Sequence, residues 1–212
     1  MDRHYRALKA CLLLLGLAAG PAGGAADAAE PCRVAVLGDS LTAGFGVRVD
    51  ASFPAQLGAA LAGEGLACEV LDAGVSGDTS AGGAARLDWV LADRPTHLLV
   101  ELGGNDALRA LPVEQLRANL DDIVTRAEAA GVEVMLAGMV PPPNLGRAYS
   151  DAFAAAYRDV AEEHGIPLYP FFLDGVVLAT GLMQPDGIHP NDRGVAEIVR
   201  RMLPSVAAWV RG

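Results

Sequence analysis

Apolar and polar positions follow two different spacings along the chain. Five short apolar runs predict buried strands at residues 33–38, 66–73, 97–102, 132–139 and 166–169. Apolar positions at helical spacing predict helices at residues 53–62, 85–92, 113–130, 149–164 and about 191–210. Gly131 and Gly165 are expected to end helices, and Pro190 to lie in the first turn of the last one. This alternation predicts a parallel sheet with helices on both faces.

Clusters of polar residues and glycines follow the first three predicted strands, and a fourth cluster lies near the end of the chain. The four segments read GDSLT from Gly38, GVSGDTS from Gly74, GGND from Gly103 and DGIHP from Asp186. Ligands of parallel sheets bind at the carboxyl ends of the strands. We therefore expect the four segments to meet at one edge of the sheet.

The first thirty residues resemble a targeting segment rather than part of a fold. Three basic residues precede an apolar stretch at 10–19, and Ala26-Asp27-Ala28 is a typical cleavage pattern. The alternative is a membrane anchor, but a spanning helix needs about 20 apolar residues. We predict a signal peptide at residues 1–28, a single domain at 29–212, and an exported protein, periplasmic or secreted, without a stable membrane anchor.

Composition excludes several classes of function. The chain is 52% hydrophobic and 20% charged, which is typical of a folded domain, and its net charge of -10 disfavours nucleic acid as a partner. Residues 29–212 contain no lysine, which removes Ser-Lys catalysis, Schiff bases and the P-loop lysine. A nucleophile must then work with histidine or a metal. No H-E-x-x-H or paired-cysteine spacing occurs, so we expect neither a metal nor a cofactor.

Asp186 and His189 are the strongest candidates for acid-base chemistry. Their spacing of three, with a glycine between them, lets both side chains project from one turn, while His97 and His164 have structural settings. Ser40 follows the first strand and can present its hydroxyl at the strand end. Each residue also has a structural interpretation when it is considered alone: Asp186 would cap a helix, and Ser40 would be a turn residue. Ser76 is disfavoured as a nucleophile because the sequence has no G-x-S-x-G elbow.

Three groups are candidates for binding an oxyanion. They are the backbone N–H groups of Ser40 and Gly77 and the side-chain amide of Asn105. The structural alternatives are ordinary, because glycines after strands form turns and Asn105 could close a loop. Only their combination with Ser40 and His189 favours catalysis.

In their order and composition, GDSLTAGFG, GVSGDTS, ELGGND and DGIHP resemble the four motifs of the SGNH, or GDSL, hydrolase superfamily. The resemblance covers nearly all of the predicted domain and is greatest with an exported branch of thioesterases, lysophospholipases and arylesterases. It implies nucleophile Ser40, a triad with Asp186 and His189, and an oxyanion hole of Ser40, Gly77 and Asn105. It also implies a flavodoxin-like three-layer α/β/α sandwich with strand order 2-1-3-4-5, and no metal.

The resemblance also bears on one loop and, through the implied strand order, on a disulfide. The loop after the fourth strand, with Pro141, Pro142, Pro143, Asn144, Leu145 and Gly146, would contact the acyl chain; the alternative is a proline-stiffened connector. Leu41, Phe45 and Met183 would line an acyl groove or belong to the core. If the first two strands are neighbours, Cys32 and Cys68 lie side by side at their amino ends, where a disulfide competes with two buried thiols.

The expected function is a serine esterase that acts on aryl or short-chain esters, lysophospholipids or acyl thioesters, as a monomer or weak oligomer. Two alternatives share the fold: a carbohydrate acetyl esterase, and an acyl-binding module without activity. A dinucleotide site fits less well, because the glycine pattern at 44–49 lacks its last glycine.

Overall fold

The computed structural model describes residues 31–212. The predicted signal peptide lies outside these residues. No helix within the described part of the chain is long and apolar enough to cross a membrane.

One parallel sheet forms the centre of the described domain. Its strands are β1 (Arg33–Gly38), β2 (Glu69–Gly74), β3 (His97–Glu101), β4 (Glu133–Ala137) and β5 (Leu168–Tyr169). They lie in the order β2-β1-β3-β4-β5, and every neighbouring pair is parallel. The order predicted through the family resemblance is therefore confirmed.

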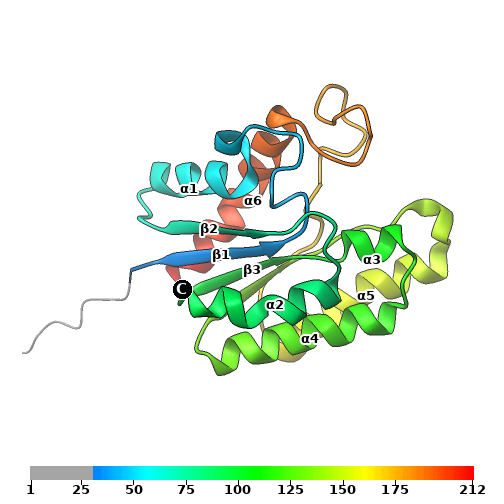
Figure 1. Ribbon diagram of the computed structural model, residues 1–212, viewed down its shortest axis with the longest axis horizontal. Helices are drawn as coiled ribbons and strands as arrows, with labels where there is room; N and C mark the ends of the chain where they lie inside the picture. The colour runs from blue at the N-terminus through cyan, green and yellow to red at the C-terminus, as the bar shows by residue number, and fades with distance from the viewer. Residues whose placement is uncertain (1–30) are drawn as a thin grey trace, which may run out of the picture.

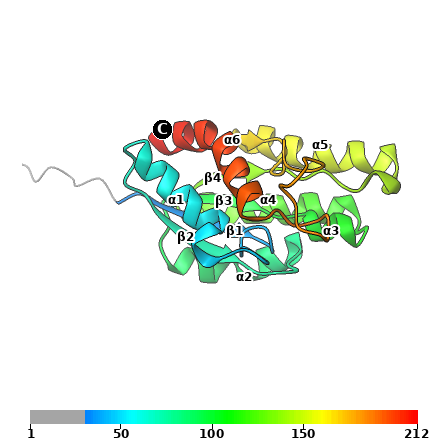
Figure 2. The same cartoon turned by 90° about the horizontal axis from the view of Figure 1, so that it is seen from above.

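Helices cover both faces of the sheet, as Figures 1 and 2 show. The helices are α1 (Phe53–Gly63), α2 (Ser80–Ala92), α3 (Gly104–Leu108), α4 (Val113–Ala129), α5 (Arg147–His164) and α6 (Asp192–Arg211), with 3-10 turns η1 (Val49–Ala51) and η2 (Pro143–Leu145). Helices α1 and α6 pack together on one face, while α2, α4 and α5 lie on the other (Figure 1). The predicted three-layer sandwich is confirmed.

The core lies between the sheet and these helices. Val34, Ala35, Val36 and Leu37 of β1 have no exposed surface, because β1 has neighbours on both edges and helices on both faces. Burial of each valine or leucine side chain stabilises the fold by about 1.5–3 kcal/mol. The rigid centre holds the carboxyl end of β1 in place, and the GDSLT segment begins there.

Two predicted boundaries are wrong by three residues or more. Strand β2 begins at Glu69 rather than 66, because the Leu66 N–H bonds to the Leu61 carbonyl and completes the end of α1. Helix α2 begins at Ser80 rather than 85, since the Thr79 side chain accepts a hydrogen bond from Gly82 and caps it. Gly82 and Gly83 interrupt the apolar pattern in the first turn of α2, so the sequence pattern predicted a later start.

Two further differences concern short elements and a cap. Helix α3 was not expected, because five residues are too few to show a helical period. Pro190 does not lie in the first turn of α6; it precedes Asn191, whose side chain caps the helix by accepting from the N–H groups of Arg193 and Gly194. The predicted glycine stops are observed, with Gly131 and Gly165 both at positive φ.

A disulfide joins Cys32 and Cys68 beside the amino ends of β1 and β2, with their Cα atoms 4.5 Å apart. It closes a loop of 36 residues at the end of the sheet away from the GDSLT segment. A crosslink restricts the unfolded chain, so replacing both cysteines by alanine is expected to lower the free energy of unfolding by about 3–4 kcal/mol. Urea unfolding of the two proteins, with ester turnover as a control, measures the effect.

Activity is expected to survive the loss of the disulfide far better than stability does, because the bond lies at the opposite end of β1 from Ser40. Thiol labelling of residues 29–212, unfolded without reductant, checks the bond itself. Two reactive thiols per chain would contradict it.

His164 joins the end of α5 to two acidic residues of α4. Its Nδ1 lies 2.8 Å from Glu128 Oε2 and its Nε2 lies 2.9 Å from Asp121 Oδ1. These carboxylates, Asp121 first, raise the pKa of the imidazole. A raised pKa in the folded state stabilises the fold fully below the unfolded value of about 6.5, and the contribution disappears as pH rises through the folded value.

We expect His164→Gln to destabilise the protein by about 1 kcal/mol near pH 5.5 and by less near pH 8.5. Urea unfolding at both pH values provides the measurement. His97→Gln is the matched control, because burial lowers the pKa of His97 instead. A deficit for His164→Gln that grows toward high pH would show that the bridge is not ionic.

Candidate active site

The carboxyl end of β1 places Ser40 at the edge of the sheet. After Gly38 the chain turns sharply, and the N–H groups of Ala43 and Phe45 bond to the carbonyls of Asp39 and Ser40 at 2.9 and 3.0 Å. A Cβ atom on Gly38 would collide with Thr42 and Glu101, so this position requires glycine. The turn holds the Ser40 hydroxyl half-buried at the floor of a cavity.

Ser40, His189 and Asp186 form one line of hydrogen bonds. Ser40 Oγ lies 2.9 Å from His189 Nε2, and His189 Nδ1 lies 2.7 Å from Asp186 Oδ2. The other Asp186 oxygen accepts from the backbone N–H groups of Ile188 and His189 at 2.9 and 3.0 Å. The bond to the imidazole, together with these two N–H groups, lowers the pKa of Asp186 to about 2. The carboxylate is thus ionised at neutral pH and can hold a proton on Nδ1.

Gln184 ties the loop of His189 to the loop of Ser40. Its Nε2 donates to the carbonyls of Phe45 at 2.7 Å and Pro190 at 2.9 Å. The ring of Phe45 also packs on the His189 ring, with centroids 4.6 Å apart. Nothing in the sequence pattern singled out Gln184, because its partners are carbonyl groups that any residue could supply.

Two backbone N–H groups beside Ser40 Oγ are free to bind an anion. Neither Ser40 N–H nor Gly77 N–H donates a hydrogen bond to another group within residues 31–212. Gly77 has φ 85°, a conformation that other residues rarely adopt, and Arg109 holds its carbonyl at 2.8 Å. Ser40 and Gly77 both line the cavity, which makes their N–H groups candidates for binding the oxygen of a bound carbonyl.

Asn105 reaches the same place from the start of α3. Its Nδ2 donates one N–H to Asp39 Oδ2 at 2.8 Å, while Asp39 Oδ1 accepts from Leu41 N–H at 2.9 Å. An amide nitrogen carries two N–H groups. Asp39 therefore fixes the orientation of the amide, and the second N–H of Asn105 remains for a ligand in the cavity.

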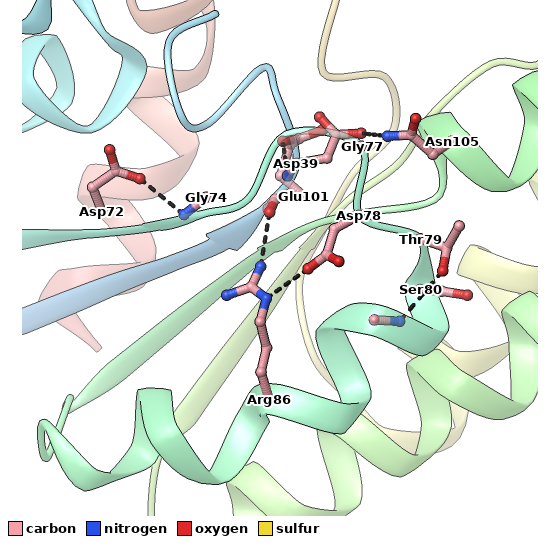
Figure 3. A network of polar contacts seen from close by, with 12 residues as sticks. Asp39, Asp72, Gly74, Gly77, Asp78, Thr79, Ser80, Arg86, Glu101 and Asn105 are labelled. Atoms are coloured by element: carbon pink, nitrogen blue, oxygen red, sulfur yellow. Dashed lines mark hydrogen bonds and ion pairs between the residues drawn. The ribbon is translucent and has the colours of Figure 1, made fainter.

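Glu101 lies buried beneath Asp39 (Figure 3). Its Oε2 accepts from Thr42 Oγ1 at 2.8 Å and from Asp39 N–H at 3.4 Å, whereas Oε1 has no partner among the described residues. Burial, followed by the adjacent Asp39, raises the pKa of Glu101 well above its usual value. Burial also raises the pKa of Asp39. Both shifts favour the neutral acid, so burial opposes two full negative charges at Glu101 and Asp39.

Arg86 of α2 braces the loop that contains Gly77. Its guanidinium donates to Asp78 Oδ2 at 2.6 Å and to the Gly38 carbonyl at 2.9 Å (Figure 3). The end of β1 and the second motif are thereby held together. Asp39, Asp78 and Glu101 lie within the predicted motifs, yet their roles depend on contacts between distant segments and were missed.

An apolar cavity of about 650 Å³ opens over Ser40. Its lining includes Ser40, Ser76, Gly77, Asn105 and His189, together with Leu41, Phe45, Ala107, Leu108, Met139, Val140, Pro141, Pro142, Pro143, Phe171, Leu173, Val177 and Ile188. Asn144, Leu145, Gly146 and Met183 do not line it, unlike the three prolines of the same loop. Within residues 31–212, no group of three His, Cys, Asp or Glu side chains is placed to hold a metal ion.

Comparison with known proteins matches this chain to enzymes. It is 42% identical over 172 residues to Esterase TesA of Pseudomonas aeruginosa, covering 81% of this chain and 86% of the relative. It is 40% identical over 184 residues to the Thioesterase 1/protease 1/lysophospholipase L1 of Escherichia coli K12, covering 86% and 83%. The crystal structure of TesA superimposes with a TM-score of 0.80 at 40% identity, covering 84% of this chain and 99% of that one.

The family comparison covers all four motifs. Residues 36–196 match the GDSL-like Lipase/Acylhydrolase family, a range that includes Ser40, Gly77, Asn105 and His189. The family expected from the motifs is therefore confirmed. This chain belongs to the GDSL-like lipase/acylhydrolase family.

Proposed function

We propose that this protein is a serine esterase that hydrolyses carboxylic ester and thioester bonds through an acyl-enzyme. The observation that carries the proposal is the line of hydrogen bonds from Asp186 through His189 to Ser40, which ends at the floor of an apolar cavity. A hydroxyl becomes an effective nucleophile when a base removes its proton and a carboxylate orients that base. Membership of an acylhydrolase family supports this chemistry.

The reaction proceeds in two acyl transfers. His189 Nε2 takes the Ser40 proton as the oxygen attacks the carbonyl, and the carbonyl oxygen becomes negative between the Ser40 and Gly77 N–H groups and the Asn105 amide. His189 then protonates the leaving alcohol or thiol. Water, activated by the same imidazole, attacks the acyl-enzyme and regenerates Ser40, while Asp186 stabilises the imidazolium in both steps.

The cavity favours acyl groups that are themselves apolar. Apart from the catalytic groups, its lining consists mainly of leucine, valine, proline, methionine and phenylalanine side chains. Such a surface suits aryl and short-chain esters, lysophospholipids and acyl thioesters better than polar glycans. The names of the two relatives, an esterase and a thioesterase and lysophospholipase, support the same range. We assign acyl-chain contact to the loop at Pro141, Pro142 and Pro143.

We also propose that the protein works outside the cytoplasm, after cleavage of residues 1–28. The sequence pattern of this segment and the Cys32–Cys68 disulfide both suit export, because disulfides persist in oxidising compartments. We expect it to act without a metal or cofactor, as a monomer or weak oligomer.

A panel of p-nitrophenyl esters of graded chain length, run beside a lysophospholipid and an acetylated glycan, tests the proposed function. We expect turnover of the acyl esters and little turnover of the glycan. A serine-directed phosphonate should add one adduct per chain, which peptide mass spectrometry should locate at Ser40. Absence of both turnover and adduct would favour the inactive acyl-binding module.

Asn105→Ala is expected to lower kcat for a p-nitrophenyl ester by about 10²–10³-fold, because one donor to the developing oxyanion is lost. KM should change much less, since the interaction strengthens only as charge develops. Asn144→Ala is the matched control, because Asn144 belongs to a neighbouring loop but does not line the cavity. Equal kcat values for the two variants would remove Asn105 from the oxyanion hole.

A further inference from the structure

Most of the large exposed apolar side chains of the described residues lie at or next to the mouth of the cavity. Residues 31–212 expose nine such side chains, and five of them, Phe45, Leu108, Val140, Val177 and Ile188, line the cavity. A sixth, Leu178, follows Val177 and is 97% exposed. We call these six residues the collar. They come from four loops or turns and from the last residue of α3, and these segments lie at the carboxyl edge of the sheet (Figure 1).

Leu178 is the most conspicuous member of the collar. Its side chain is almost completely in water, and its backbone has φ 66°, in the left-handed region. Glycine and asparagine are the usual residues there, because a leucine Cβ is strained in this conformation. Both its exposure and its backbone are therefore unfavourable in the isolated protein, and burial of the side chain against an apolar partner would offset that cost.

From the collar we infer that this face docks the enzyme on the surface of a lipid aggregate without net charge, such as a phosphatidylcholine membrane or a lysophosphatidylcholine micelle. The inference rests on the proposed function, since it gives the physical state in which an acyl ester would be met. A lipid surface can insert an acyl chain through the collar into the cavity. A protein partner or a second copy seated on the collar would instead cover the entrance to Ser40.

The charges of the protein indicate which headgroup charge the lipid surface should have. Four of the five segments that carry the collar, residues 44–46, 139–146, 171–178 and 187–189, contain no arginine or lysine. The one carboxylate of these four segments, Asp174, is paired with Arg201 at 2.9 Å. In the fifth segment Arg109 follows Leu108, and its guanidinium donates to the Gly77 carbonyl at 2.8 Å. The chain as a whole has a net charge of -10, which repels anionic headgroups at long range. An uncharged collar on an acidic protein therefore suits a zwitterionic surface.

Vesicle flotation tests the inference. The parent protein is residues 29–212 with Ser40→Ala, which keeps the vesicles intact and makes binding independent of turnover. We expect it to float with phosphatidylcholine vesicles, and Leu178→Asn to reduce the partition coefficient by at least about tenfold. Asparagine tolerates the left-handed backbone, so thermal melting should show no loss of stability.

Trp89→Asn is the matched control. Trp89 is 80% exposed on α2, and it is not part of the collar. Its replacement removes more apolar surface than Leu178→Asn does, yet vesicle binding should not change. With Ser40 intact, Leu178→Asn should hydrolyse a soluble p-nitrophenyl ester at the normal rate and micellar lysophosphatidylcholine more slowly.

Three results would overturn docking on a neutral lipid surface. They are no flotation of the parent protein, equal flotation of the Leu178→Asn and Trp89→Asn variants, and tighter binding to phosphatidylglycerol vesicles. Self-association that depends on Leu178 in sedimentation velocity, without vesicle binding, would assign the collar to a second copy and also overturn it. Failure of the proposed esterase activity is a separate outcome, seen with soluble esters.

Discussion

Replacement of Ser40 by alanine is expected to lower kcat for p-nitrophenyl butyrate by about 10⁶-fold, which leaves only the oxyanion donors and the cavity to act on the ester. The Ser40 hydroxyl has one hydrogen-bond partner within the described chain, His189 Nε2. Its removal therefore breaks no contact that supports the fold. Circular dichroism and thermal melting should be unchanged, and the phosphonate adduct should disappear.

Ser76→Ala is the control for this prediction. Ser76 also lines the cavity, and it follows Gly74-Val75 in a segment that approaches a nucleophile elbow. The structure gives Ser76 no hydrogen bond to a histidine within residues 31–212, while Ser40 has one. We expect Ser76→Ala to retain kcat within about tenfold. If Ser40→Ala kept its activity and Ser76→Ala lost it, the nucleophile would be Ser76.

The hydrogen-bonded arrangement of Asp186, His189 and Ser40 could be predicted because each of its parts depends on local sequence. Asp186 and His189 are three residues apart, so a single turn brings them together, and Ser40 follows a strand whose apolar run is unmistakable. The meeting of Ser40 and His189 is not local, since 149 residues separate them. It was predictable because carboxyl ends of parallel strands share one edge of the sheet.

The supporting residues could not be predicted in the same way. Glu101 lies in a strand that reads as apolar, and its contact with Thr42 joins residues 59 apart in sequence. Arg86 and Gln184 bind backbone carbonyls, and carbonyl groups carry no sequence signal. Ser80, the first residue of α2, donates its N–H to Asp106, which is 26 residues away in sequence. A tertiary contact therefore helps to set the start of α2, which the sequence pattern placed at residue 85.

These supporting contacts explain how a site built on loops becomes rigid. Ser40 lies on a turn, and Gln184 and Arg86 tie that turn to the two loops that bear His189 and Gly77. Asp39 then links the turn that carries Ser40 to Asn105, because its carboxylate accepts hydrogen bonds from Leu41 N–H and Asn105 Nδ2. Donors fixed in this way need not reorganise when charge develops on the substrate, which is the main source of oxyanion stabilisation.

Asp186→Asn is expected to lower kcat by about 10⁴-fold with little change in the fold. The amide oxygen of asparagine can still accept from Ile188 and His189 N–H, but its NH₂ group would face His189 Nδ1. A donor there favours the tautomer with its proton on Nε2, and that nitrogen can then no longer accept the Ser40 proton. The kcat of the variant should fall while KM stays close to normal.

The pH dependence distinguishes this orienting role from a simple loss of stability. Because the pKa of Asp186 is lowered to about 2, the carboxylate is ionised throughout the range from about pH 5 to 9. The kcat deficit of the Asn variant should therefore be constant across that range. The lowered pKa stabilises the fold above the unfolded value of about 3.9, and this contribution is lost as pH falls through about 2.

Asp174→Asn is the control, because Asp174 is an exposed carboxylate near the same face whose partner is Arg201 instead of a histidine. We expect it to retain normal kcat. Steady-state kinetics of both variants on p-nitrophenyl butyrate, at pH values from about 5 to 9, provide the comparison. No other side chain within residues 31–212 is hydrogen-bonded to His189 Nδ1. A deficit below tenfold for Asp186→Asn would therefore mean that His189 does not need a carboxylate to orient it.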